Sequence, residues 1–125
     1  MTSASSGQRR FPRSVYQVGT EPDPRFTLAN ERTFLAWIRT ALAFIAAGVA
    51  LQALAIPMQA GLRRTAAVLL LLLGLTVPTL AWFSWGAVER ALRQGAPLPG
   101  SKVALPAAIG VSIAAALLLL GILLQ

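Results

Sequence analysis

Basic residues that border long apolar segments are the side chains of this sequence best suited to chemistry. They are Arg25, Arg32, Arg39, Arg90 and Lys102. Guanidinium and ammonium groups bind carboxylates and phosphates through charge-assisted hydrogen bonds, and rings of such groups line anion pores. Neither Arg32 nor Arg39 has an acidic residue three or four positions away, so their partners lie elsewhere. The set predicts an anion site, while positive-inside topology with phospholipid contact explains the same charges and stays open.

Polar residues in the segment that leads into the first apolar span are assigned supporting roles. Thr27 or Asn30 is the expected N-cap of the first helix. We expect Glu31 to orient the arginines, and Asn30 and Thr33 to cap the helix and donate hydrogen bonds. The aromatic Trp37 completes this supporting set. If several copies of the chain assemble, the excess positive charge repeats as a ring that faces an anionic partner.

Residue types that most enzymes need are scarce in this chain. It has no His and no Cys, and only 4 Asp and Glu residues against 11 Lys and Arg residues. Imidazole bases, thiolate nucleophiles and the usual soft metal ligands are therefore missing. We expect no catalysis, no metal site and no cofactor. Nucleic acid is not an expected partner either, because the basic residues border apolar spans.

The elements that must position the basic residues are apolar helices. Hydrophobic residues make up 56% of the 125 residues, and charged residues make up only 12%. Segments without charge separate the basic residues, and each is close to the ~20 residues that cross a bilayer as a helix. The sequence predicts an all-α integral membrane protein with three transmembrane helices, over about residues 34–57, 65–85 and 103–124.

The tail and the orientation of the chain follow from its Pro and basic residues. Residues 1–24 are rich in Ser, Gly, Arg and Pro, which predicts a disordered basic tail ahead of a transmembrane domain over residues 25–125. Most Lys and Arg residues lie on the side of the N-terminus, and only Arg63 and Arg64 lie opposite. The positive-inside rule then predicts a cytoplasmic N-terminus and a C-terminus outside.

One face of the first helix combines arginines with small residues. At about 100° per residue, a single stripe contains Arg32, Ala36, Arg39, Ala43, Ala46, Ala50 and Ala53. Small residues let membrane helices approach closely, so the alanines are expected to form a packing seam. A pore lining is the alternative.

The segment from Arg25 to Thr40 carries a family resemblance. Its core, Ala29-Asn30-Glu31-Arg32-Thr33-Phe34-Leu35 followed by Trp37, resembles the signature of the YidH family of small bacterial membrane proteins. The same module is similar to the transmembrane part of the vacuolar transporter chaperone complex, which makes polyphosphate and moves it across a membrane. The resemblance implies a multi-pass protein of the bacterial inner membrane, assembled as a ring and by analogy a pentamer. Arg25 and Arg32, with Glu31 beside them, would stand at the entrance of an anion path.

Two classes of function are expected from these observations. In the first, the chain is a small homo-oligomeric membrane protein that binds or conducts an anion, with phosphate or polyphosphate as the expected species. In the second, it is a non-conducting scaffold or accessory subunit that docks a protein partner or an anionic lipid through the same charged face. Membrane lipids are partners in both. Exposure of the alanine stripe to water or to protein separates the two.

Overall fold

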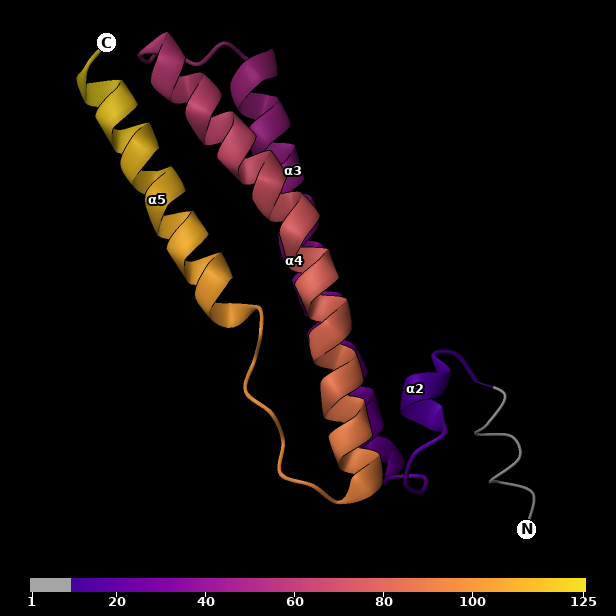
Figure 1. Cartoon of the computed structure of the whole chain (residues 1–125). Coiled ribbons are helices and arrows are strands. Elements are labelled where there is room, and N and C mark those ends of the chain that lie inside the picture. Colours follow the sequence, from indigo (N-terminus) through magenta and orange to yellow (C-terminus); the bar gives the residue numbers. More distant parts are fainter. Residues whose placement is uncertain (1–9) are drawn as a thin grey trace.

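The computed structural model describes residues 10–125, and all regular structure in this range is helical. The helices are α2 (Arg13–Tyr16), α3 (Pro24–Ala53), α4 (Ala60–Gln94) and α5 (Ala104–Leu123) (Figure 1). Among them, α3, α4 and α5 are each long and apolar enough to cross a membrane. The expected all-α fold, with three helices of membrane-spanning length, is confirmed.

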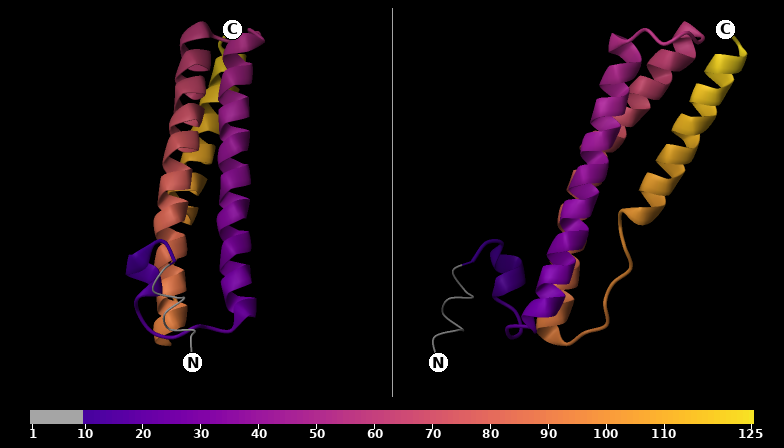
Figure 2. Two further views of the ribbon diagram at one scale, coloured as in Figure 1. Left: turned by 90° about the vertical axis from the view of Figure 1, so that its right-hand side faces the viewer. Right: turned by 180° about the vertical axis from the view of Figure 1, so that it is seen from behind.

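The long helices form an antiparallel hairpin, α3 with α4, and α5 packs on α4 (Figures 1 and 2). The start of α3 and the loop between α4 and α5 lie at one end of the bundle, which we call the basic end (Figure 1). The loop between α3 and α4 lies at the opposite end, together with the C-terminus (Figure 1). This topology is the one that three passes through a membrane require.

The excess length of α3 and α4 over α5 lies at the basic end. α5 has 20 residues, which is about 30 Å of helix and close to the thickness of a hydrocarbon core. Val103, which precedes α5, packs in one buried cluster with Ala41 of α3 and Ala81 of α4. Residues 24–40 of α3 and 82–94 of α4 therefore continue beyond the start of α5. We call these two segments the extension.

The predicted spans differ from the helices in their bounds. α3 covers Pro24–Ala53 instead of 34–57, and α4 continues to Gln94 instead of ending near residue 85. α5 agrees with its prediction within about one residue at each end. An apolar segment predicts only the part of a helix that lies in a membrane. The extension carries polar residues, so this pattern does not include it.

The long helices begin and end at residues that fit capping positions. α3 begins at Pro24, because the Asp23 carboxylate accepts a backbone N–H of the first turn at 2.9 Å and proline suits the first helical position. The predicted N-cap was wrong, since Thr27 and Asn30 both lie inside α3. α4 ends at Gln94, and Gly95, which follows it, has a φ of 64°, the left-handed conformation that commonly ends a helix.

Residues 10–23, which we call the N-terminal arm, differ from the disordered tail that the sequence predicts. The arm folds back along the basic end of α4 and contains the single turn α2 (Figure 2). Val15 is only 1% exposed, so the arm contributes a core residue. Phe11 and Tyr16 add aromatic contacts with α4, which offset the ordering of the chain. The predicted disorder of residues 1–9 lies outside the described residues.

The interface between α3 and α4 uses a different face of α3 from the predicted alanine seam. Its buried α3 residues are Asn30, Ala41, Gly48 and Leu51. Within one chain, most alanines of the stripe are exposed, namely Ala36, Ala43, Ala46 and Ala53. A glycine permits a closer approach of two backbones than an alanine does, so α4 packs along the face that holds the glycine. The alanine face is left uncovered by α4 and α5.

Substitution of Gly48 by leucine is expected to force α3 and α4 apart. A Cβ atom at this position would lie 3.0 Å from the Ala67 carbonyl oxygen and 3.0 Å from the Leu71 Cγ. Overpacking of this kind costs about 1–3 kcal/mol. Thermal unfolding in detergent should give a lower Tm for Gly48→Leu than for Ala47→Leu, a matched control because Ala47 is exposed. Equal losses in the two variants would contradict this interface.

Candidate functional site

Two of the predicted anion-binding residues share one pocket. Arg90 and Lys102 line a hollow of about 220 Å³ at the basic end. We call it the basic pocket, and its lining consists of Ser14, Val15, Trp82, Phe83, Trp85, Gly86, Ala87, Arg90 and Lys102. Among residues 10–125, no carboxylate lines this hollow, so Arg90 and Lys102 have no negative side chain of the pocket to neutralise them.

Helix α4, the N-terminal arm and the loop before α5 build the basic pocket. Trp82, Gly86 and Arg90 follow at four-residue spacing and therefore share one face of α4. The arm crosses this face at Gly86, where an added Cβ would lie 3.6 Å from the Val15 Cγ2. The Arg90 Nε donates to the Ser14 carbonyl oxygen at 3.3 Å. The loop before α5 supplies Lys102. The arm supplies Ser14 and Val15, which could not be predicted as pocket residues because the sequence predicts a disordered tail there.

The other three predicted anion-binding residues lie outside the basic pocket. Arg25 is paired with Asp23, with an Nη2–Oδ2 distance of 2.8 Å, and its guanidinium holds the pKa of Asp23 below the usual value of 3.8. Arg32 and Arg39 are exposed on α3, and the described part of the chain gives neither of them a hydrogen bond or an ion pair. Arg39 lies close in sequence to Ala41, which packs at the level where α5 begins. Arg39 therefore lies near the level where α5 begins.

Asn30 and Thr33 make contacts other than the predicted caps. Asn30 is buried, and its Nδ2 donates to the Trp85 carbonyl oxygen at 3.0 Å and to the Glu89 Oε1 at 3.2 Å. Asn30 thus ties α3 to α4 within the extension. The Thr33 hydroxyl donates to the carbonyl oxygen one turn earlier in α3, at 3.2 Å. The capping role belongs to Asp23 instead.

Glu31 and Trp37 occupy different surroundings. Glu31 is exposed and forms no ion pair within residues 10–125. Trp37 is half-buried and lines a second cavity of about 290 Å³ between α3, α4 and the loop before α5. Aromatic and aliphatic side chains dominate that cavity, and none of the five predicted anion-binding residues is in its lining.

Glu89 was not predicted as a site residue, yet it is the most buried charged side chain of the described residues. It is 1% exposed. Its carboxylate accepts hydrogen bonds from the Thr27 hydroxyl at 2.9 Å and from Asn30, and it has no ion pair within residues 10–125. The sequence signal is a lone carboxylate one helical turn after Trp85. Only tertiary contacts reveal that it faces α3.

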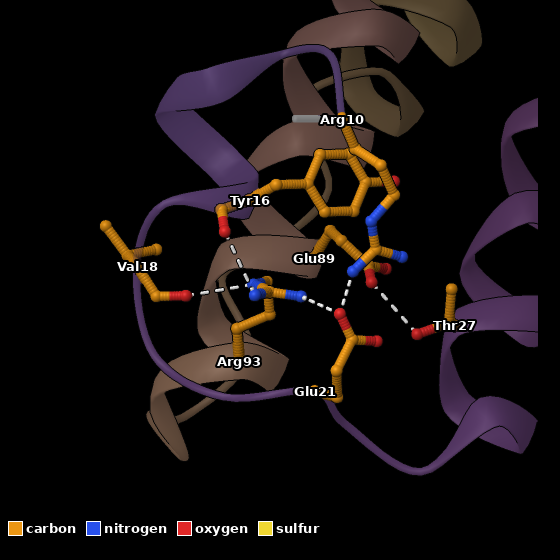
Figure 3. A network of polar contacts seen from close by, with 7 residues as sticks. All are labelled: Arg10, Tyr16, Val18, Glu21, Thr27, Glu89 and Arg93. Atoms are coloured by element: carbon orange, nitrogen blue, oxygen red, sulfur yellow. Dashed lines mark hydrogen bonds and ion pairs between the residues drawn. The ribbon is translucent and has the colours of Figure 1, made fainter. Parts of the chain in front are cut away.

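Arg93 fastens the N-terminal arm to the end of α4, and the sequence treats it as one loop cation among several. It is 6% exposed. Its Nε donates to the Val18 carbonyl oxygen at 2.9 Å, and its Nη2 donates to that of Tyr16 at 3.0 Å (Figure 3). Its Nη1 donates to the Glu21 carboxylate at 3.2 Å, which is also paired with Arg10 (Figure 3). Arg93 therefore holds the arm that forms one wall of the basic pocket.

Comparison with known proteins identifies a family and two relatives. A family described as a domain of unknown function, DUF202, matches residues 25–91. Two uncharacterised proteins, from two strains of Mycobacterium tuberculosis, are each 41% identical over 83 residues, which is 63% of this chain and 66% of the relative. No solved structure matches the chain.

These matches confirm the family expected from the segment that begins at Arg25, and none of them is to the vacuolar transporter chaperone. The matched range holds α3 and most of α4, including Asn30, Glu89 and Arg90, whereas Lys102 and the arm lie outside it. The chain belongs to the DUF202 family, a membrane-type domain of unknown function.

Proposed function

We propose that this protein binds a phosphate-type anion at the basic end of its helical bundle, in the basic pocket. The convergence of Arg90 and Lys102 on one hollow without a carboxylate carries the proposal. A guanidinium supplies a planar fork of donors and an ammonium supplies a compact charge, and both groups bind phosphate oxygens.

The position of the basic pocket supports a phosphate that lies at the membrane surface. Trp82 lines the pocket one residue after Ala81, which packs at the level where α5 begins. Lys102 directly precedes Val103, in the same buried cluster. Aromatic side chains are common at this depth, where the phosphates of lipid headgroups lie. The same chemistry fits a lipid headgroup or a soluble phosphate, and the family resemblance makes polyphosphate the soluble candidate.

The orientation proposed for the protein follows its basic residues. The basic end faces the cytoplasm and the C-terminus lies outside, in a bacterial inner membrane. Of the basic residues within 10–125, only Arg63 and Arg64 lie at the opposite end, beside the start of α4. The positive-inside rule supports this orientation, which also exposes the basic pocket to cytoplasmic phosphates and to anionic lipids of the inner leaflet.

Self-association is the second part of the proposal, and the uncovered face of α3 supports it. Arg32 and Arg39 lie on this face among exposed alanines, so a single chain encloses no path between them. Copies that pack through the alanines would bring these arginines together as a ring, by analogy in a pentamer. An anion path or a scaffold that docks a partner is compatible with such a ring. Binding, without catalysis, is the activity we propose for the single chain.

Titration of the detergent-solubilised protein with inorganic phosphate and short polyphosphate tests the proposal. Arg90→Gln and Lys102→Gln should each weaken binding by about tenfold or more, because a hydrogen bond to a charged group is worth about 1.5–3 kcal/mol. Arg64→Gln removes one exposed charge from the opposite end and should leave the affinity unchanged. An Arg32→Gln/Arg39→Gln variant that alone loses binding would favour the α3 ring over the basic pocket.

A further inference from the structure

An apolar hollow on α4 lies beside the basic pocket. This hollow, which we call the apolar groove, has a volume of about 520 Å³ and is lined by Phe11, Pro78, Thr79, Trp82 and Phe83. It shares Trp82 and Phe83 with the basic pocket. Trp82 and Phe83 therefore form a wall common to a basic and an apolar hollow.

The two hollows lie one after the other along α4, with the apolar groove nearer the start of α5. Arg90, Gly86, Trp82 and Pro78 are spaced by four residues, so they form one ridge about 18 Å long that winds gradually around α4. Val77 and Ala81 pack in the buried cluster at the start of α5. The apolar groove therefore lies where the membrane-spanning part begins. Arg90 lies about 12 Å beyond Trp82 along α4, on the side away from the membrane.

This order of surfaces fits a phospholipid better than a soluble phosphate. A soluble anion would occupy the basic pocket alone and leave the apolar groove exposed, whereas a phospholipid places its headgroup against Arg90 and Lys102 and an acyl chain in the groove. Two cations without a carboxylate favour a lipid with net negative charge over a zwitterionic one.

The N-terminal arm forms a wall of both hollows. Phe11 stacks on Trp82, with ring centroids 6.2 Å apart, at the apolar groove. Ser14 and Val15 line the basic pocket four residues or fewer from Phe11. Since Arg93 holds the arm in place, the complete lipid site exists only while the arm is docked.

Resting on the function proposed above, we propose that the phosphate-type anion is the headgroup of an anionic phospholipid, held by Arg90 and Lys102, with one acyl chain in the apolar groove. The site lies at the basic end of the bundle, on the side of the inner leaflet. Each chain binds one lipid of the phosphatidylglycerol class.

Fluorescence quenching by brominated lipids tests this inference at the shared wall of the two hollows. A Trp37→Phe/Trp85→Phe background leaves Trp82 as the single tryptophan of the chain. The protein is placed in phosphatidylcholine vesicles that contain a small fraction of phosphatidylglycerol. Two samples have the same lipid composition and the same amount of brominated acyl chain. The bromines are on phosphatidylglycerol in one sample and on phosphatidylcholine in the other. We expect about 25-fold enrichment of the anionic lipid at Trp82, because Arg90 and Lys102 each contribute about 1 kcal/mol near anionic lipid, and each contribution is a factor of roughly five.

Variants separate the lipid inference from the proposed function. Arg90→Gln/Lys102→Gln should abolish the enrichment, and Arg64→Gln should keep it. Thr79→Phe fills the apolar groove and should reduce the enrichment while inorganic phosphate still binds; Phe11→Ala provides a second groove variant if Thr79→Phe does not fold. Equal quenching by both lipids, with phosphate binding that still depends on Arg90 and Lys102, would overturn the lipid inference alone. Loss of that dependence for phosphate and lipid together would overturn the proposed function.

Discussion

Replacement of Arg93 by alanine is expected to release the N-terminal arm from α4. The substitution removes three hydrogen bonds from a guanidinium. It leaves the carbonyl oxygens of Tyr16 and Val18 without this donor, and the Glu21 carboxylate keeps only its pairing with Arg10. Bonds to charged groups are worth about 1.5–3 kcal/mol each and are not additive, so we expect docking of the arm to weaken by about 2–4 kcal/mol.

Hydrogen exchange of the arm amides measures this loss. The Thr20 N–H donates to the Arg93 carbonyl oxygen at 2.9 Å, so its exchange rate reports docking directly. The rate should rise by about 30- to 1,000-fold in Arg93→Ala, since about 1.4 kcal/mol corresponds to a factor of ten. Arg13→Ala removes an exposed cation of the arm itself and serves as control. An unchanged rate at Thr20 in Arg93→Ala would show that Arg93 does not hold the arm.

Replacement of Glu89 by alanine has the second largest expected effect. The Thr27 hydroxyl and the Asn30 amide would lose a shared acceptor in a site that is closed to water, and each unsatisfied group costs about 1–3 kcal/mol. We expect Glu89→Ala to lower the free energy of unfolding by about 2–4 kcal/mol. The cavity left by the removed side chain lowers the free energy of unfolding by a smaller further amount.

The conservative variant shows whether the carboxylate acts as an acceptor or as a charge. Glu89→Gln keeps one acceptor oxygen for Asn30, and the Thr27 hydroxyl can rotate to accept from the new amide. Its loss should stay within about 1 kcal/mol. A double-mutant cycle with Asn30→Ala, followed by unfolding in detergent, should give a coupling energy of about 1–3 kcal/mol. A zero coupling energy would remove Glu89 from the contact between α3 and α4.

The sequence predicts the membrane-spanning part of the fold because composition alone determines it. Charge-free segments of helical length identify α3, α4 and α5 before any contact is known. The extension beyond the start of α5 is less visible, since its polar residues resemble those of a loop. A capping signal existed at Asp23-Pro24, but the prolines around it also favour a disordered tail, and sequence alone does not separate the two.

In the candidate site, too, the sequence predicts which residue types are present but not which contacts they make. Arg90 and Lys102 were predicted from charge and position, and the structure places them in one pocket. Arg93 and Glu89 carry the same kinds of charge nearby, yet both are buried and fasten elements together. Which basic residue faces a hollow and which faces a carbonyl depends on how the arm crosses α4, a long-range contact that has no local periodicity. Which face of α3 stays exposed likewise depends on where α4 packs against it.

The distance from the Lys102 ammonium nitrogen to a bound phosphorus tests the central claim most directly. Lys102 is the single lysine of the chain, so lysine labelled with ¹⁵N at Nζ gives one side-chain ammonium signal in solid-state NMR. A phosphate in the basic pocket predicts strong ³¹P dephasing of this signal at about 3.5–4 Å, since ammonium–oxygen hydrogen bonds are about 2.8 Å long. The dephasing should fall sharply in Arg90→Gln and persist in Arg64→Gln. A Lys102 signal without ³¹P dephasing, in anionic lipid and with added phosphate, would contradict the claim that this protein binds a phosphate-type anion in the basic pocket.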